Sequence, residues 1–164
     1  MPKKKYTQQR PERLRLEFTE EFWLVAVQSQ LEIFELVYHI NYLMHSHFAR
    51  TDDDIVMGEM KKGWPIYRWQ FSENAPPEYI FSNHLDQMLS PEDNTLELLK
   101  DLQTPWFKKV YLLTQFKQVD FFIKLHDQIR GKIFESELKK IQGVTLSFLV
   151  SMMQIKNPRL LIFE

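Results

Sequence analysis

The sequence contains no cysteine among its 164 residues. Disulfide bonds, thiolate nucleophiles, zinc–thiolate sites and iron–sulfur clusters are therefore excluded. Glycine is scarce as well, with four residues, and none of them belongs to a loop that could cradle a phosphate. The G-x-S-x-G motif of serine hydrolases does not occur. A nucleotide-binding fold is not expected, and we predict no cofactor.

Long apolar runs and an excess of charge are also lacking. No run approaches the roughly 18 to 20 apolar residues that a membrane-spanning helix needs. Lys3, Lys4 and Lys5 make the N-terminus basic, but no apolar stretch follows at the distance of a secretory signal. The formal net charge is −1, so no overall field attracts nucleic acid or membrane. We therefore expect a cytoplasmic protein with no membrane association.

The residues that are present are typical of a globular chain, with a hydrophobic fraction of 44% and an aromatic fraction of 14%. The length fits one domain. We predict a disordered basic tail at residues 1–12 and a single α+β domain at residues 13–164. Residues 84–106 interrupt the strand pattern, and Ser90-Pro91 followed by two acids is a strong helix start. We predict a helical insertion there.

The rest of the domain is organised around residues 110–125, V-Y-L-L-T-Q-F-K-Q-V-D-F-F-I-K-L. Two apolar runs, at 110–113 and 119–125, predict buried strands because they are rich in aromatic and β-branched residues. Asp120 lies inside the second run. An acid at such a position must find hydrogen-bond donors or solvent, since its desolvation costs several kcal/mol, roughly.

Alternation and helical spacing predict the remaining elements. Ser29 and Glu32 form a capping-box pattern before a helix at residues 31–48. A second helix is predicted around residues 133–141, ended by Gly143. Further strands are predicted at residues 13–18, 22–27, 55–57, 66–71, 79–81, 144–150 and 160–163. The predicted fold class is α+β, a mostly antiparallel mixed sheet with two β-α-β units and helices packed on it.

Several stretches together carry a family resemblance. Residues 113–121 contain Leu113-Thr114-Gln115, three further residues, and then Val119-Asp120-Phe121. The chain also contains F-W-L-V-A-V at 22–27, R-T-D-D-D-I at 50–55, I-F-S-N at 80–83 and K-I-Q-G-V at 140–144. In these features it resembles the IPExxxVDY proteins of the Bacteroidetes lineage, over about residues 16–163.

The resemblance implies a family with no assigned activity. The sequence departs from the family motif at Thr114-Gln115, where the motif has a proline and a glutamate. Because the amide of Gln115 cannot act as a general base, the resemblance implies a structural motif, formed by Leu113, Gln115, Val119, Asp120 and Phe121.

Asp120 is the first candidate for chemistry. An acid beside a strand most often accepts backbone N–H bonds, so a structural role is favoured. The alternative is an acid/base site formed by Asp120 and His126, which requires both side chains to face one pocket. No catalytic residue is assigned from the sequence.

Asp52, Asp53 and Asp54, with His45 and His47, form the second candidate, since carboxylates and imidazoles bind divalent ions. The two histidines are two residues apart on the predicted helix and point in different directions. Adjacent aspartates also diverge, and no known metal motif is present. We predict a solvated connection and no metal site.

Aromatic residues supply the third candidate. Tyr67, Trp69 and Phe71 share one face of a predicted strand, and such a face is usually buried. If exposed, Trp64, Trp69 and Phe71 would form a partner-binding surface. With the basic tail, the same face could stack RNA bases.

The sequence thus favours a non-enzymatic module that binds a protein partner or forms a homo-oligomer, with sheet edges available for pairing. An RNA-binding module and an enzyme with a site near Asp120 are the alternatives.

Overall fold

The computed structural model describes residues 21–57, 63–88 and 107–163 of the chain. The predicted tail at 1–12, the predicted strand at 13–18 and most of the predicted helical insertion lie outside these residues. Residues 84–88, which precede the predicted helix start at Ser90, form a strand.

Within the described ranges the main sheet has six strands in the order β2-β3-β4-β7-β1-β8. The strands are β1 (Trp23–Ser29), β2 (Ala49–Arg50), β3 (Ile66–Trp69), β4 (Glu78–Ser82), β7 (Phe121–Leu125) and β8 (Val144–Ser151). Every neighbouring pair is antiparallel. The α+β class is confirmed. The two predicted β-α-β units are not confirmed, because the strands that each helix connects are not paired with each other.

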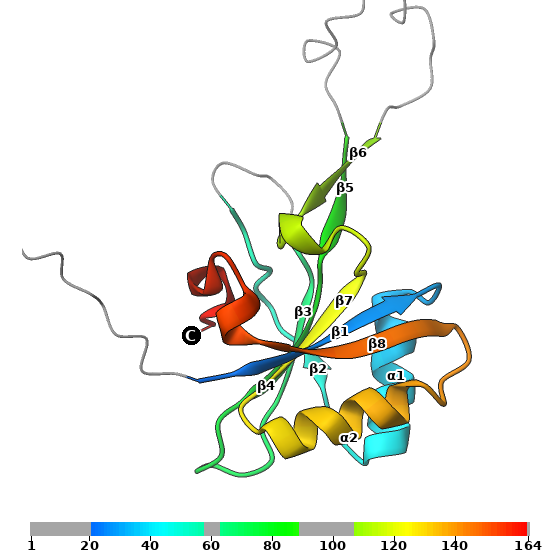
Figure 1. Ribbon diagram of the computed structural model, residues 1–164, viewed down its shortest axis with the longest axis vertical. Helices are drawn as coiled ribbons and strands as arrows, with labels where there is room; N and C mark the ends of the chain where they lie inside the picture. Colours follow the sequence, from blue (N-terminus) through cyan, green and yellow to red (C-terminus); the bar gives the residue numbers. More distant parts are fainter. Residues whose placement is uncertain (1–20, 58–62, 89–106, 164) are drawn as a thin grey trace, which may run out of the picture.

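Helices α1 (Ile33–Met44) and α2 (Gln128–Leu138) cover one face of the sheet (Figure 1). Their buried side chains, among them Leu36, Ile40 and Phe134, pack against Val25 and Ile123 of the central strands. The capping box of α1 is formed by Glu32 and Glu35, three residues beyond the predicted start at Ser29. Ser29 remains in β1, so its hydroxyl is available to the turn before β8.

The described residues that cover the other face form turns and no α-helix. The turns η4 (Met152–Gln154) and η5 (Pro158–Leu161) lie there (Figure 1), and Ile155 and Leu161 are buried against Phe81 and Phe122. The predicted last strand at 160–163 is wrong, because the chain after Pro158 forms a 3-10 turn that inserts Leu161 into the core.

Strands β5 (His84–Met88) and β6 (Phe107–Tyr111) form a separate hairpin that projects from the end of β4 (Figure 1). The predicted buried strand at 110–113 is therefore wrong in its position: β6 ends at Tyr111, and Leu112 and Leu113 turn into the core before η3 (Thr114–Phe116). Among the described residues, neither α-helix has the length and apolar character needed to cross a bilayer.

Candidate functional site

The motif predicted from the sequence lies in the segment that joins the hairpin to β7. We call residues 112–120 the motif turn. It is built around Asn83, whose side chain is fully buried. Asn83 Oδ1 accepts the Leu113 N–H at 2.8 Å, and Nδ2 donates to the carbonyls of Phe116 at 2.8 Å and Val119 at 3.0 Å. The backbone N–H of Asn83 donates to Asp120 O at 2.8 Å. One amide side chain thus holds both ends of the turn.

The other motif residues also bind within the chain. Leu113 and Val119 are buried on the sheet face that carries η4 and η5. Phe121 is buried on the opposite face, beneath the helices. Gln115 donates from Nε2 to the carbonyl of Gln154 at 2.7 Å and accepts the Lys156 N–H at Oε1 at 3.0 Å. Gln115 therefore fastens the C-terminal segment to the motif turn, which is a structural role.

Asp120 stands just before β7, between β1 and the hairpin. Its Oδ2 accepts the Ser29 N–H at 2.9 Å, and its Oδ1 lies 3.2 Å from His84 Nε2. Partial burial raises the pKa of Asp120, but the hydrogen bonds from His84 and Ser29, with the electrostatic attraction of His84 and Lys109, outweigh it and hold the pKa below its usual value. The carboxylate is ionised at neutral pH and joins three segments of the chain.

A cleft of about 400 Å³ opens beside Asp120, between the start of α1 and the hairpin. His84, Asp86 and Lys109 line it from the hairpin, and Lys109 lies directly across from Asp86 in the strand pairing. An imidazole oriented by a carboxylate can act as a general base. The nearby Ser29 hydroxyl is already engaged, since it donates to Gly143 O and accepts the Leu31 N–H. It does not stand as a nucleophile.

The structure does not bring Asp120 and His126 together. The two residues lie at opposite ends of β7, about 20 Å apart at the rise of an extended strand. His126 Nε2 lies 3.2 Å from the carbonyl of Pro77. The pocket that the sequence assigned to this pair does not form, and His84 takes the position facing Asp120.

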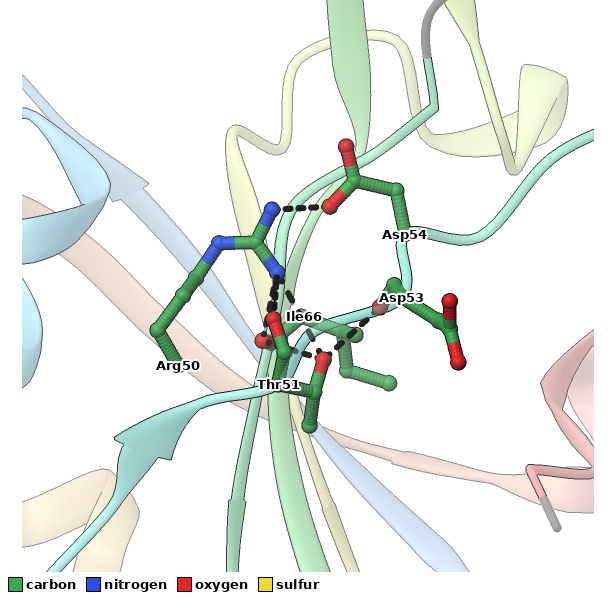
Figure 2. A network of polar contacts seen from close by, with 5 residues as sticks. All are labelled: Arg50, Thr51, Asp53, Asp54 and Ile66. Carbon is green, nitrogen blue, oxygen red and sulfur yellow. Dashed lines mark hydrogen bonds and ion pairs between the residues drawn. The ribbon is translucent and has the colours of Figure 1, made fainter.

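The aspartates at 52–54 lie in a loop ordered by its own polar contacts. Arg50 pairs with Asp54 and donates to Thr51 O, while the Thr51 hydroxyl contacts the carbonyls of Asp53 and Ile66 at 2.7 and 3.0 Å. Figure 2 shows the Asp54 carboxylate turned toward Arg50 and the Asp53 carboxylate directed away from it. In the described part of the chain, His, Asp and Glu side chains do not gather in groups of three or more that could hold a metal.

The candidate partner surface at Trp64, Trp69 and Phe71 is not continuous. Trp64 is fully buried, because its backbone bridges to Ile55 and directs the ring into the core, so it cannot belong to an exposed partner surface. Trp69 is half-buried between Phe48 and Phe71, with the Arg130 guanidinium 5.0 Å from its ring centre. Only Phe71 among the three is strongly exposed, at 82%.

The two edges of the main sheet differ in kind. At one edge β2 has two residues, one of them Arg50. At the other edge β8 has eight residues, V-T-L-S-F-L-V-S, with neither charge nor proline. Across the described residues β8 pairs only with β1, and no other strand lies on its outer side (orange in Figure 1). The outer backbone groups of β8 thus have no partner strand in residues 21–57, 63–88 and 107–163.

Sequence reasoning missed three residues and one feature of the sheet that matter here. Asn83 and His84 directly follow β4, but a lone Asn and a lone His give no periodic signal. Lys124 is buried in β7 with its ammonium 4.9 to 5.7 Å from the rings of Phe22, Tyr79 and Phe163. The alternation of Phe122 and Lys124 could have placed this lysine on the aromatic face. The position of β8 at the sheet edge depends on strand order, which local sequence does not carry.

No family model, no curated protein and no solved structure matches this chain. The resemblance to the IPExxxVDY proteins therefore stays a prediction.

Proposed function

We propose that this protein is a non-enzymatic protein-binding module that accepts an additional strand at the outer edge of β8. The observation that carries the proposal is this edge itself: eight residues long, uncharged, without proline, irregular only at Thr145 near its start, and unpaired on its outer side among the described residues. Natural sheet edges are usually kept short, charged, bulged or covered, because an open edge pairs with other chains. The opposite edge, β2, follows that rule.

Strand addition fits the chemistry of this edge. The main-chain groups of an added strand supply hydrogen bonds, and its alternating side chains extend the two faces of the sheet. Leu146 is 45% exposed although it stands in a strand of the main sheet, and Phe148 and Leu149 are only partly buried. An added strand gives these side chains neighbours and removes apolar surface from water.

A synthetic peptide tests strand acceptance directly. The probe is a fluorescent strand of alternating valine and threonine with lysines at its ends, and the readout is fluorescence anisotropy. We expect saturable binding to the wild-type protein and weaker binding to Leu146→Lys. A peptide with methylated backbone nitrogens on one edge is the matched control, because it keeps the side chains but lacks the donors. Equal binding of both peptides, or of neither, contradicts strand addition.

A second candidate function, acid–base catalysis, is favoured by one observation: His84 faces Asp120 at the cleft. Its test compares hydrolysis of p-nitrophenyl acetate by His84→Gln and by His126→Gln, which alters a partly buried histidine far from the cleft. Catalysis at the cleft predicts loss of activity in the first variant only. Equal rates in both variants and in the wild type dismiss this candidate.

The RNA-binding alternative draws less support. Tyr67 and Trp69 pack against the helix-side core, so of the three aromatic residues proposed to stack bases only Phe71 is strongly exposed.

A further inference from the structure

We propose that the strand accepted by β8 is the β8 of a second copy of this chain, running antiparallel, so that two sheets join edge to edge. This inference rests on the proposed function and names its partner. Three features of β8 support it: its lack of charge, the distribution of its side chains over the two faces, and the unequal character of the two sheet edges.

The lack of charge matters because of symmetry. Two antiparallel copies of one strand are related by a two-fold axis perpendicular to the sheet, so the interface is isologous. The residue nearest the axis lies opposite its own copy, and a charged residue there meets the same charge. The sequence of β8, from Val144 to Ser151, contains no residue that would be repelled in this way.

The side chains of β8 are sorted between the faces in a way that a second copy would continue. Phe148 and Val150 pack in the core cluster on the face without helices. On the opposite face Leu149 packs in the helix-side cluster, and the Ser147 hydroxyl donates to Glu135 O of α2 at 2.8 Å. Residues directly opposite one another in an antiparallel pair share a face. The apolar face therefore continues across the seam and covers Leu146.

The opposite edge does not offer the same arrangement. β2 has two residues, and the side chain of one of them, Arg50, contacts the loop at 51–54. Pairing of β2 with its own copy would form few hydrogen bonds and bring two guanidinium groups together. Between the two edges of the main sheet, association is thereby directed to β8, and the closed dimer has one seam.

This geometry restricts the register. Because the axis runs between the strands, midway between the two copies of one residue, the pairing that uses most of β8 is centred on Ser147 or on Phe148. Residues on either side of the centre then face different positions of the partner. A cross-link between identical positions is consequently favoured at the centre alone.

Single cysteines test this prediction without interference, since the chain has no cysteine of its own. The scan places one cysteine at each of five positions in the full-length protein: Thr145, Leu146, Ser147, Phe148 and Leu149. Cross-linking by mild oxidation is measured on non-reducing gels. Ala49→Cys, on the exposed edge strand β2, is the matched control. We expect the covalent dimer to peak at 147 or 148, and to fall several-fold on both sides and in the control.

Light scattering measures the molar mass of the wild-type protein, so this second test does not depend on a variant that folds poorly. We expect the molar mass to rise from that of the monomer to that of the dimer as the protein concentration increases. If the mass stays monomeric while the valine–threonine peptide still binds, the proposal that the partner is a second copy is overturned. The proposal that β8 accepts a strand then survives. If the peptide also fails to bind, both proposals are overturned. Cross-linking that is equal at all five positions and at Ala49 also overturns the two-fold pairing.

Discussion

The motif turn and the edge of β8 treat their backbone polar groups in opposite ways. In the motif turn the N–H of Leu113 and the carbonyls of Phe116 and Val119 all meet the buried side chain of Asn83. Along β8 the inner groups pair with β1, while the outer groups have no partner strand in the part of the chain that is described. The first region is closed by its own chain, and the second is left open.

This difference separates a region that stabilises the fold, the motif turn, from a region proposed to bind a partner, the edge of β8. Buried polar groups must be satisfied, because each unsatisfied one costs about 1 to 3 kcal/mol. The motif residues meet that requirement internally, which is why they are assigned to the fold. Among the described residues no strand pairs with the outer groups of β8, and water can satisfy such groups at little cost to the fold, which is why this edge is assigned to interaction.

The largest effect is expected from Asn83→Ala. The substitution leaves one N–H and two carbonyls of the motif turn without their partner, so we expect a loss of roughly 3 kcal/mol or more in the free energy of unfolding. Urea unfolding followed by tryptophan fluorescence measures it. Asn83→Asp is the control, since it keeps the acceptor for Leu113 but loses the donor to both carbonyls. A loss below about 1 kcal/mol would mean that the turn is not held by this side chain.

Leu146→Lys should weaken dimerisation at the edge of β8. The lysine enters each copy of a symmetric pair, and its charge lies beside the seam, so we expect the dimer dissociation constant to rise roughly tenfold or more. Sedimentation equilibrium gives the constant, and thermal unfolding at low concentration should change little. Tyr38→Lys places the same charge on an exposed aromatic position of α1, away from β8. An equal rise in both variants would point to unspecific apolar association.

Asp120→Asn should have a smaller effect, about 1 kcal/mol at neutral pH, because it removes the charge from two hydrogen bonds. The pKa of Asp120 is lowered in the folded protein. Its contribution is therefore complete above the pKa of an unfolded aspartate, about 3.9, and is lost as the pH falls through the lower folded value. The stability difference between wild type and variant should shrink in acid. A difference that is constant from neutral pH to pH values well below the unfolded pKa contradicts the assignment.

The smallest effect belongs to Gln115→Ala, for which we expect less than about 1 kcal/mol, since Gln115 is half-exposed and water can replace its two bonds. Hydrogen exchange at Lys156 should rise locally while global stability hardly changes. Gln115→Glu retains the acceptor for the Lys156 N–H and should restore its protection. Unchanged exchange at Lys156 in Gln115→Ala would show that this bond does not hold the C-terminal segment.

Local patterns predicted much of the fold. The apolar run at 22–27, the alternation at 66–71 and the run at 144–150 correspond to β1, β3 and β8, and the helical spacing after Ser29 corresponds to α1. In each case one or both sides of the element face a core, which leaves a period in the sequence. The α+β class follows from these elements.

The failures arise where long-range contacts decide. Leu112 and Leu113 continue an apolar run, yet Asn83 captures the backbone there and turns it away from strand pairing. The run after Pro158 is apolar because it packs beneath the sheet, not because it joins it. The partner of Asp120 could not be predicted, since His84 lies 36 residues away and meets it only through the β4–hairpin junction.

Hydrogen exchange as a function of protein concentration tests the contrast between the closed turn and the open edge most directly. Residue-resolved exchange should show the amides of Asn83 and Leu113 protected equally at all concentrations. The outward-facing amides of β8 should exchange rapidly in dilute protein and slow down by the same factor as the dimer population grows. Protection along β8 that does not depend on concentration, or motif-turn amides that exchange as fast as exposed loops, would contradict the account.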